Sequence, residues 1–230
     1  MHECSKNYTP AVGSKFFPDG SVKAFAGNSL VSNLDSHLPQ FDLLVGLQQR
    51  MQQKYFAEFF TFLPPDSFHM TVKDLLCDQV REPLSWSTKI NPTLSFNEVE
   101  EEIIALLDGV KLEHKLNMKF DRFNLKKTVG PIIKPADFET EKLLSEFRDM
   151  VSDVTGIRHP THDSYEFHIS LAYILIKFNS KTSRDVDDFL MEEGEKLKKN
   201  FGILTLPPPA LVFFPDMHNF PTTPLFGYKT

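Results

Sequence analysis

The chain has 230 residues, of which 41% are hydrophobic and 24% charged, values typical of a folded globular protein. Its formal net charge of −6 argues against the broad basic surface that binding of a long nucleic acid duplex requires, although a site for one phosphate needs only a few aimed donors. The longest apolar segment, ISLAYILI, is too short to cross a bilayer, and the first residues lack a signal-peptide pattern. We therefore expect a cytoplasmic protein without a membrane anchor.

Strand-like and helix-like patterns alternate along the chain, with no long linker or low-complexity tract between them. In chain order, the patterns predict a strand over 28–34, a helix over 44–59, a strand over 68–75, a helix over 97–107, strands over 114–125 and 129–134, a helix over 144–154, a strand over 167–176, a helix over 186–201 and a strand over 209–214. Asn97, with Glu100 three residues later, is the predicted N-cap of the second helix, and Gly109, Gly156 and Gly202 are predicted to end the last three helices. The two halves of the chain show the same order of predicted strands and helices, which indicates an internal duplication of architecture.

One short phrase occurs once in each half, as FHMTV and as FHISL. Because side chains alternate along a strand, His69 and Thr71 share one face and the apolar residues of the phrase share the other. His168 and Ser170 share a face in the second copy for the same reason. A histidine followed two positions later by Ser or Thr also occurs elsewhere, but only these two histidines are framed by apolar residues. If the halves pair about a pseudo-twofold axis, two histidines and two hydroxyls meet in one cleft.

Such a set of side chains suits the cleavage of a phosphodiester. The reaction needs a base for the attacking oxygen, an acid for the leaving oxygen and donors for the phosphoryl oxygens on which charge builds. Two histidines whose pKa values are split by their environments supply the base and the acid, and the residues alone do not decide which is which. Thr71 and Ser170 supply the donors to the phosphate. No metal or other cofactor is then required.

The paired motifs HMTV and HISL resemble those of the two-histidine (2H) phosphoesterase superfamily, which includes RNA ligase and cyclic nucleotide phosphodiesterase-like proteins. The flanking text, such as GSKFFPDG, FAGNS and TGIRHPTHDSYEFHISLAY, resembles a poorly characterised branch of unknown function. The resemblance implies an α+β bilobal fold of two pseudo-twofold-related lobes, with antiparallel sheets lining a central cleft and helices outside. It implies a single domain over 1–230, with approximate lobes 1–115 and 116–230 between which strands can cross.

The resemblance also implies a metal-independent phosphodiesterase with His69 and His168 as catalytic residues. Its expected substrate is a 2′,3′-cyclic phosphate, a cyclic nucleotide, or an oligonucleotide or RNA end, and we expect it to act as a monomer. Two alternatives stay open: a non-catalytic protein that binds a nucleotide or phosphate in the same cleft, and an RNA end-joining activity, for which the sequence has no clear lysine motif. The presence of both an acid and a base candidate favours catalysis.

Four further residues are candidates for substrate contacts. Lys73 follows Thr71 by two positions, so strict alternation places both on the same face. Arg158, His162 and Tyr165 lie in the polar run before the second phrase, and loops at strand ends commonly line clefts. All four could contact the part of a substrate that surrounds its phosphate.

The same polar run contains RHPTHD, which has a His-x-x-His spacing and a carboxylate, as some metal sites do. Pro160 interrupts helical spacing in this run, and no matching cluster occurs elsewhere in the sequence. We therefore expect a polar loop and no metal site.

Overall fold

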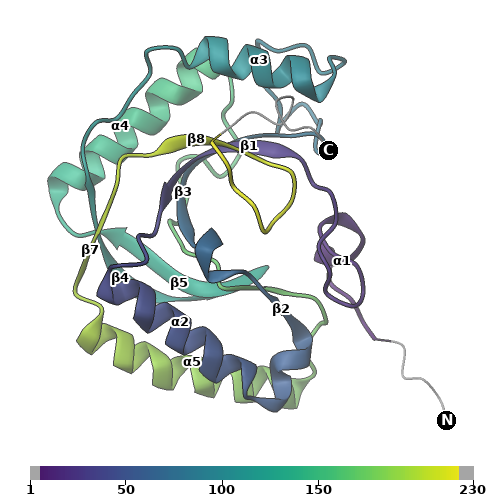
Figure 1. The fold of residues 1–230 in the computed structure, drawn as a ribbon, viewed down its shortest axis with the longest axis vertical. Helices are drawn as coiled ribbons and strands as arrows, with labels where there is room; N and C mark the ends of the chain where they lie inside the picture. The colour runs from purple at the N-terminus through teal and green to yellow at the C-terminus, as the bar shows by residue number, and fades with distance from the viewer. Residues whose placement is uncertain (1–5, 223–230) are drawn as a thin grey trace.

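Two antiparallel sheets form the framework of residues 6–222, the part of the chain that the computed structural model describes (Figure 1). The first sheet has the strand order β3-β1-β8, with β1 at Gly27–Asn33, β3 at His69–Cys77 and β8 at Ala210–Phe214. The second has the order β2-β6-β5-β4-β7, with β2 at Phe60–Phe62, β4 at Leu116–Leu125, β5 at Thr128–Pro135, β6 at Ala172–Ile174 and β7 at Ile203–Leu206. Strands cross between the two halves, because β8 joins the first sheet and β2 the second. The predicted α+β fold with antiparallel sheets is confirmed.

The helices pack outside these sheets. They are α1 at Ala11–Ser14, α2 at Pro39–Gln52, α3 at Phe96–Leu106, α4 at Phe138–Thr155 and α5 at Ser180–Asn200, with short 3₁₀ helices at Tyr55–Phe59 and Pro65–Ser67. Figure 1 shows α2 and α5 side by side along one edge of the molecule, with α3 and α4 toward the opposite edge. An ion pair joins the first two, in which Arg50 Nε of α2 donates to the Oε1 atom of buried Glu193 in α5 at 3.0 Å. No helix within residues 6–222 has both the length and the apolar character needed to span a membrane.

The predicted helix over 44–59 is divided in two. α2 ends at Gln52, and Lys54 has an extended backbone with φ −86° and ψ 151° before the 3₁₀ helix begins. Phe56, on the 3₁₀ helix, is buried in the same hydrophobic core as Leu44 of α2. The apolar stripe continues across the break, which is why periodicity alone did not reveal it.

The start of α3 also differs from the prediction. The capping box is formed by Ser95, whose side chain accepts from the Glu98 N–H, and by Glu98, which accepts from the Ser95 N–H. The predicted pair, Asn97 and Glu100, lies inside the helix, and Glu100 is fully buried. The predicted end of α4 is confirmed, because Gly156 adopts the left-handed conformation with φ 68°.

The second copy of the repeated phrase joins the two sheets. Ile169 forms an antiparallel bridge with Met70 of β3, and His168 forms one with Ile132 of β5. Only β6, within the predicted strand over 167–176, has regular strand geometry. The second phrase makes only isolated bridges, one to a strand of each sheet. The first sheet is thereby connected to the second through the segment that carries the second motif.

The apolar side chains of the two phrases are buried, as their alternation predicts. Met70, Val72 and Ile169 are 0% exposed and Leu171 is 1% exposed. All four belong to one hydrophobic core that extends across both sheets. The histidines and hydroxyl residues of both phrases are partly exposed, because they point to the other face.

β5 approaches the second phrase closely at Gly130. A Cβ atom at this position would lie 1.9 Å from the carbonyl oxygen of Ile169, which is inside the contact distance of any two heavy atoms. The neighbouring Pro131 carbonyl accepts a hydrogen bond from the Ile169 N–H at 3.0 Å. The missing side chain of Gly130 therefore allows the position of the segment that carries His168 and Ser170.

We predict that Gly130→Ala lowers the free energy of unfolding by about 2 kcal/mol or more, because the added methyl group forces β5 away from the second phrase. Gly194→Ala is the matched control, since a Cβ at this position in α5 has its nearest neighbour, a carbon of Phe123, at 3.7 Å. This control should keep or gain stability, by up to about 1 kcal/mol from helix propensity. Urea denaturation measures both changes. Equal stability of the two variants would contradict the role given to Gly130.

Candidate active site

The antiparallel bridge between β3 and the second phrase fixes how the two motifs face each other. In an antiparallel pair, the residues before and after a bridged pair also lie opposite one another. His69 therefore lies opposite Ser170 and Thr71 opposite His168, with opposed Cβ atoms about 5 Å apart. Because the bridged side chains point into the core, these four point to the other face. We call these four side chains the motif cluster.

Both histidines of the motif cluster are oriented by the backbone in the same way. Nδ1 of His69 lies 2.7 Å from the carbonyl oxygen of Ser67, and Nδ1 of His168 lies 2.9 Å from that of Glu166. Because a carbonyl oxygen only accepts, each Nδ1 carries a proton and donates it. Nε2 is then an acceptor in the neutral ring and a donor in the charged ring. The repeated contact leaves the same atom of both rings available for proton transfer.

The environment of His69 favours its neutral form. Burial lowers the pKa of His69 below its ordinary value of 6.5, the hydrogen bond to the Ser67 carbonyl opposes this shift, and the charge of His168 adds to it. Phe220 contributes to the burial, with its ring centre 4.3 Å from that of His69. At neutral pH His69 therefore presents a lone pair on Nε2.

Tyr165 borders the motif cluster on the side of Thr71. Burial raises the pKa of Tyr165 well above its ordinary value, and a side-chain hydrogen bond with Thr71 opposes the shift, so the phenol stays protonated at neutral pH. The ring centre of Tyr165 lies 6.3 Å from that of His168. Among the four further candidates, Tyr165 is thus placed against the motif side chains.

Lys73 does not share the face of Thr71, contrary to the prediction from strict alternation. In the pairing of β3 with β1, Thr71 lies opposite Val31 and Lys73 opposite Leu30, so Val72 is an extra residue in the ladder. A bulge of this kind reverses the alternation of side chains beyond it. Lys73 consequently turns away from the motif cluster, and only 2% of the residue is exposed.

The ammonium group of Lys73 lies in a buried polar cluster. It donates to Ser152 Oγ at 2.7 Å and to His162 Nδ1 at 2.8 Å. The other ring nitrogen of His162, Nε2, donates to Asp149 Oδ1 at 3.0 Å. Burial, followed by the charge of Arg148, lowers the pKa of Lys73 to about 8. Lys73 and His162, two of the predicted substrate contacts, are therefore hydrogen-bonded to each other.

Arg148 of α4 connects the buried polar cluster with the first phrase. Its guanidinium group donates to the carbonyl oxygens of Val72 and His162 and lies 4.5 Å from the centre of the Tyr165 ring. Only 6% of Arg148 is exposed. One side chain thus holds the bulge of β3, the loop before the second phrase, and the ring that borders the motif cluster.

Arg158, the remaining candidate, lies at the surface. It pairs with Asp149 at 2.9 Å and with Asp163 at 2.6 Å, and about half of its side chain is exposed. The run RHPTHD around it is a loop, as predicted. Within residues 6–222, no group of three or more His, Cys, Asp or Glu side chains is arranged to hold a metal ion.

Arg148 and Ser152 were not selected from the sequence, although a signal for them exists. Both lie on the buried face of α4, close to Phe147 and Val151 of its apolar stripe. A charged or hydroxyl side chain inside such a stripe must find buried hydrogen-bond partners, which singles it out as structural or functional.

We predict that the stability of the wild type, measured relative to Lys73→Met, rises with pH between about 8 and 10.5. In this window the unfolded chain keeps the Lys73 proton that the folded protein has lost, since the ordinary pKa is 10.5 and the folded value about 8. Rising pH therefore favours the folded state, with a slope of at most about 1.4 kcal/mol per pH unit. Urea denaturation at several pH values measures the difference. Lys198→Met, at an exposed position of α5, should follow the wild type.

Two solved structures that are similar to this chain carry no function in their descriptions. The crystal structure of ATU0111, a conserved protein of unknown function from Agrobacterium tumefaciens str. C58, is 28% identical with a TM-score of 0.86, over 96% of this chain and 94% of that chain. TT0787 of Thermus thermophilus is 14% identical with a TM-score of 0.42, over 80% of this chain and 86% of that chain. No curated protein matches the chain.

The family comparison agrees with the paired motifs. Residues 15–129 match the family 2H-phosphodiest, described as a domain of unknown function (DUF1868). This range contains the first motif, with His69 and Thr71, and the start of the strand β5 that approaches the second. The chain belongs to the 2H-phosphodiest family.

Proposed function

We propose that this protein is a metal-independent phosphodiesterase in which the motif cluster performs the reaction. The observation that carries the proposal is the antiparallel pairing of the two motifs, which sets each histidine opposite the hydroxyl of the other motif. Both rings also donate Nδ1–H to a backbone carbonyl and leave Nε2 free for the substrate. A pair of proton-transfer groups flanked by two hydroxyl donors matches the needs of phosphodiester cleavage.

The lowered pKa of His69 supports its role as the base, which leaves His168 as the acid. Neutral His69 takes the proton from the attacking water as its oxygen forms a bond to phosphorus. His168, in its protonated form, gives a proton to the leaving oxygen as the other P–O bond breaks. Thr71 and Ser170 donate hydrogen bonds to the phosphoryl oxygens. One water is added across the bond, and the two histidines exchange protonation states.

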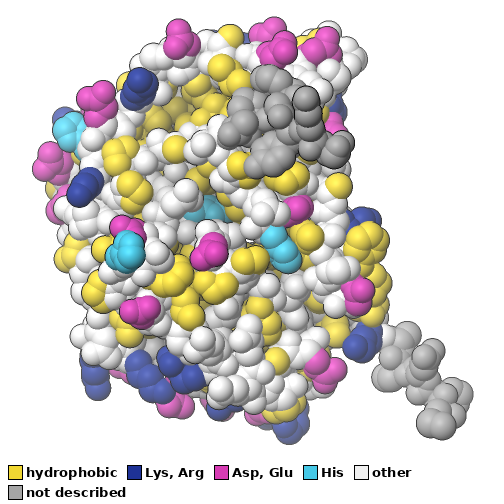
Figure 2. Space-filling model, viewed as in Figure 1, with side chains coloured by type: hydrophobic (Ala, Val, Ile, Leu, Met, Phe, Trp, Pro, Cys, Tyr) yellow, Lys and Arg dark blue, Asp and Glu magenta, His cyan; other side chains and the backbone are white. Residues whose placement is uncertain are grey.

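The proposed substrates are small phosphodiesters: a 2′,3′-cyclic phosphate, a cyclic nucleotide, or an oligonucleotide or RNA end. Figure 2 supports a small ligand, because hydrophobic, acidic and histidine side chains occupy the middle of the face shown, whereas Lys and Arg gather at its periphery. Such a face lacks the continuous basic track of a duplex-binding surface. The cytoplasmic location and the monomeric state expected from the sequence stay predictions.

We predict that His69→Ala and His168→Ala each lower kcat/KM by about 10² or more, because each removes one proton transfer. Thr71→Val and Ser170→Ala should cost about 10-fold to 10³-fold, since each removes a single donor to the phosphoryl group. The assay is turnover of 2′,3′-cyclic nucleotides and short 2′-5′ and 3′-5′ oligomers in the presence of EDTA. His37→Ala, at an exposed position between β1 and α2, is the control and should keep full activity. Undiminished turnover in His168→Ala, or loss of wild-type turnover in EDTA, would refute the mechanism.

The pH profile of kcat/KM should be bell-shaped, with an acid limb below the ordinary histidine pKa of 6.5. The acid limb follows the deprotonation of His69, whose pKa is lowered, and the two apparent values belong to the coupled pair. Phe220→Ala should move the acid limb to higher pH, because it exposes the His69 ring to water. Phe17→Ala, which alters a residue 48% exposed, should leave the limb in place. An acid limb that does not respond to Phe220→Ala would argue against His69 as the base.

A further inference from the structure

The bulge in β3 determines which side chain follows Thr71 on the face of the motif cluster. Thr71 lies opposite Val31 of β1, and Asp74 lies opposite Ser29. Val31 and Ser29 are two positions apart in β1, so they share one face. Asp74 therefore shares the face of Thr71, where strict alternation had placed Lys73. The bulge replaces the expected cation at this position with a carboxylate.

Asp74 borders the motif cluster. Successive residues on one face of a strand lie about 7 Å apart, and Asp74 is the next residue after Thr71 on this face. Its charge also acts on the site. Burial lowers the pKa of His69, and the charge of Asp74 is among the effects that oppose this lowering. Burial raises the pKa of Tyr165, which is hydrogen-bonded to Thr71, and the charge of Asp74 adds to this rise.

The carboxylate of Asp74 is exposed and makes no hydrogen bond or ion pair within the described part of the chain. The nearby cations Lys73 and Arg148 are buried, and they donate to other side chains and to backbone carbonyls. No basic side chain of the described residues therefore neutralises Asp74 by direct contact. Its two oxygens are available to accept hydrogen bonds from a ligand.

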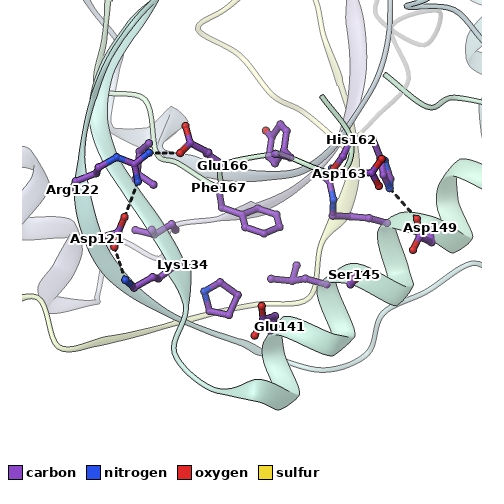
Figure 3. A pocket seen from close by; sticks show the side chains of 16 residues that line it. Asp121, Arg122, Lys134, Glu141, Ser145, Asp149, His162, Asp163, Glu166 and Phe167 are labelled. Atoms are coloured by element: carbon purple, nitrogen blue, oxygen red, sulfur yellow. Dashed lines mark hydrogen bonds and ion pairs between the residues drawn. The ribbon is translucent and has the colours of Figure 1, made fainter. Parts of the chain in front are cut away.

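A separate pocket of about 380 Å³ lies around Phe167, between α4 and the strands β4 and β5 (Figure 3). Phe167 alternates with His168 along the second phrase, so its ring points away from the face of the motif cluster. Among the described residues, those that line this pocket include none of the motif cluster. One of its cations, Lys134, is already paired with Asp121, as Figure 3 shows. We therefore look for substrate contacts on the face that carries Asp74.

A carboxylate beside the phosphate site favours an uncharged hydrogen-bond donor. The motif cluster holds one negatively charged phosphoryl group, so a second phosphate beside Asp74 would be repelled by both charges. A hydroxyl group donates a hydrogen bond to the carboxylate instead. In a nucleoside 2′,3′-cyclic phosphate, the 5′-hydroxyl lies across the ribose ring from the phosphorus. This hydroxyl can therefore reach one strand step beyond the phosphate.

We propose that Asp74 is a specificity-determining residue, which accepts a hydrogen bond from the free 5′-hydroxyl of a nucleoside 2′,3′-cyclic phosphate and disfavours a phosphate at the same place. This inference rests on the proposed function and narrows its substrate class. A mononucleoside with a single cyclic phosphate is the preferred substrate. The cyclic end of an RNA chain is a poor one, because its last nucleoside carries a phosphate on the 5′ oxygen.

The kinetic test compares adenosine 2′,3′-cyclic phosphate with the same compound phosphorylated at its 5′-hydroxyl. The wild type should favour the 5′-hydroxyl compound by about tenfold or more in kcat/KM, as expected for a hydrogen bond to a charged group. Asp74→Asn keeps the shape of the side chain and removes its charge, so it should lose most of this preference, mainly by faster turnover of the phosphorylated compound. Asp42→Asn, at an exposed position of α2, is the matched control and should keep the preference. Equal use of both compounds by the wild type, or a preference that survives Asp74→Asn, would overturn the role of Asp74.

The salt dependence of this preference separates a charge effect from a steric one. Dissolved ions screen the repulsion between an exposed carboxylate and a phosphate, so the wild-type preference should fall as the ionic strength rises. The small preference left in Asp74→Asn should not change with salt. A wild-type preference that is independent of ionic strength would contradict a role based on charge.

A binding measurement separates the role of Asp74 from the catalytic proposal. Calorimetric titration with adenosine 3′-monophosphate and with adenosine 3′,5′-bisphosphate needs no turnover. Tighter binding of the monophosphate by the wild type, together with equal binding of both compounds by Asp74→Asn, supports the role even if no cyclic phosphate is hydrolysed. Equal binding by the wild type, binding of neither compound, or a difference that persists in Asp74→Asn counts against it, even if hydrolysis is observed.

Discussion

The close approach of β5 to the second phrase at Gly130 is the constraint on which the site depends. The segment that carries His168 and Ser170 has no sheet of its own, and it uses one edge for β5 and the other for β3. A side chain at position 130 would collide with the backbone of Ile169 and push the segment away from β5. The face-to-face arrangement of the motifs is therefore a property of backbone pairing, and the side chains of the motif cluster only have to point away from the core.

The buried polar cluster around Lys73 and Arg148 also stabilises the position of the motif cluster. The bulge at Val72 divides β3 into a part that serves the motif and a part that turns Lys73 toward α4. Buried cations are costly unless their donors are satisfied, and here a hydroxyl, an imidazole and backbone carbonyls accept from Lys73 and Arg148. The cost is reflected in the lowered pKa of both cations. These hydrogen bonds fix the positions of α4 and of the loop before the second phrase relative to the first motif.

Local rules predicted the parts of this structure that depend on neighbours in sequence. Alternation correctly placed the apolar residues of both phrases in the core, and Gly156 correctly marked the end of α4. The same rule failed at Lys73, because a bulge is defined only by the partner strand. The position of Arg148 in the apolar stripe of α4 marks it as buried, but its acceptors are carbonyls distant in the chain, and these partners could not be predicted from α4 alone. The pocket at Phe167 likewise forms from separate elements that come together only in the fold.

The exchange of strands between the halves limits how this molecule can be divided. β1 is paired on one side with β3 and on the other with β8, which comes from the far end of the chain. A fragment ending near residue 115 would leave that edge of β1 open, and an open edge is a template for pairing with other chains. Neither half of the chain alone can complete its sheet, and each would expose an unpaired strand edge that favours aggregation. The native order of both sheets therefore needs strands from both fragments.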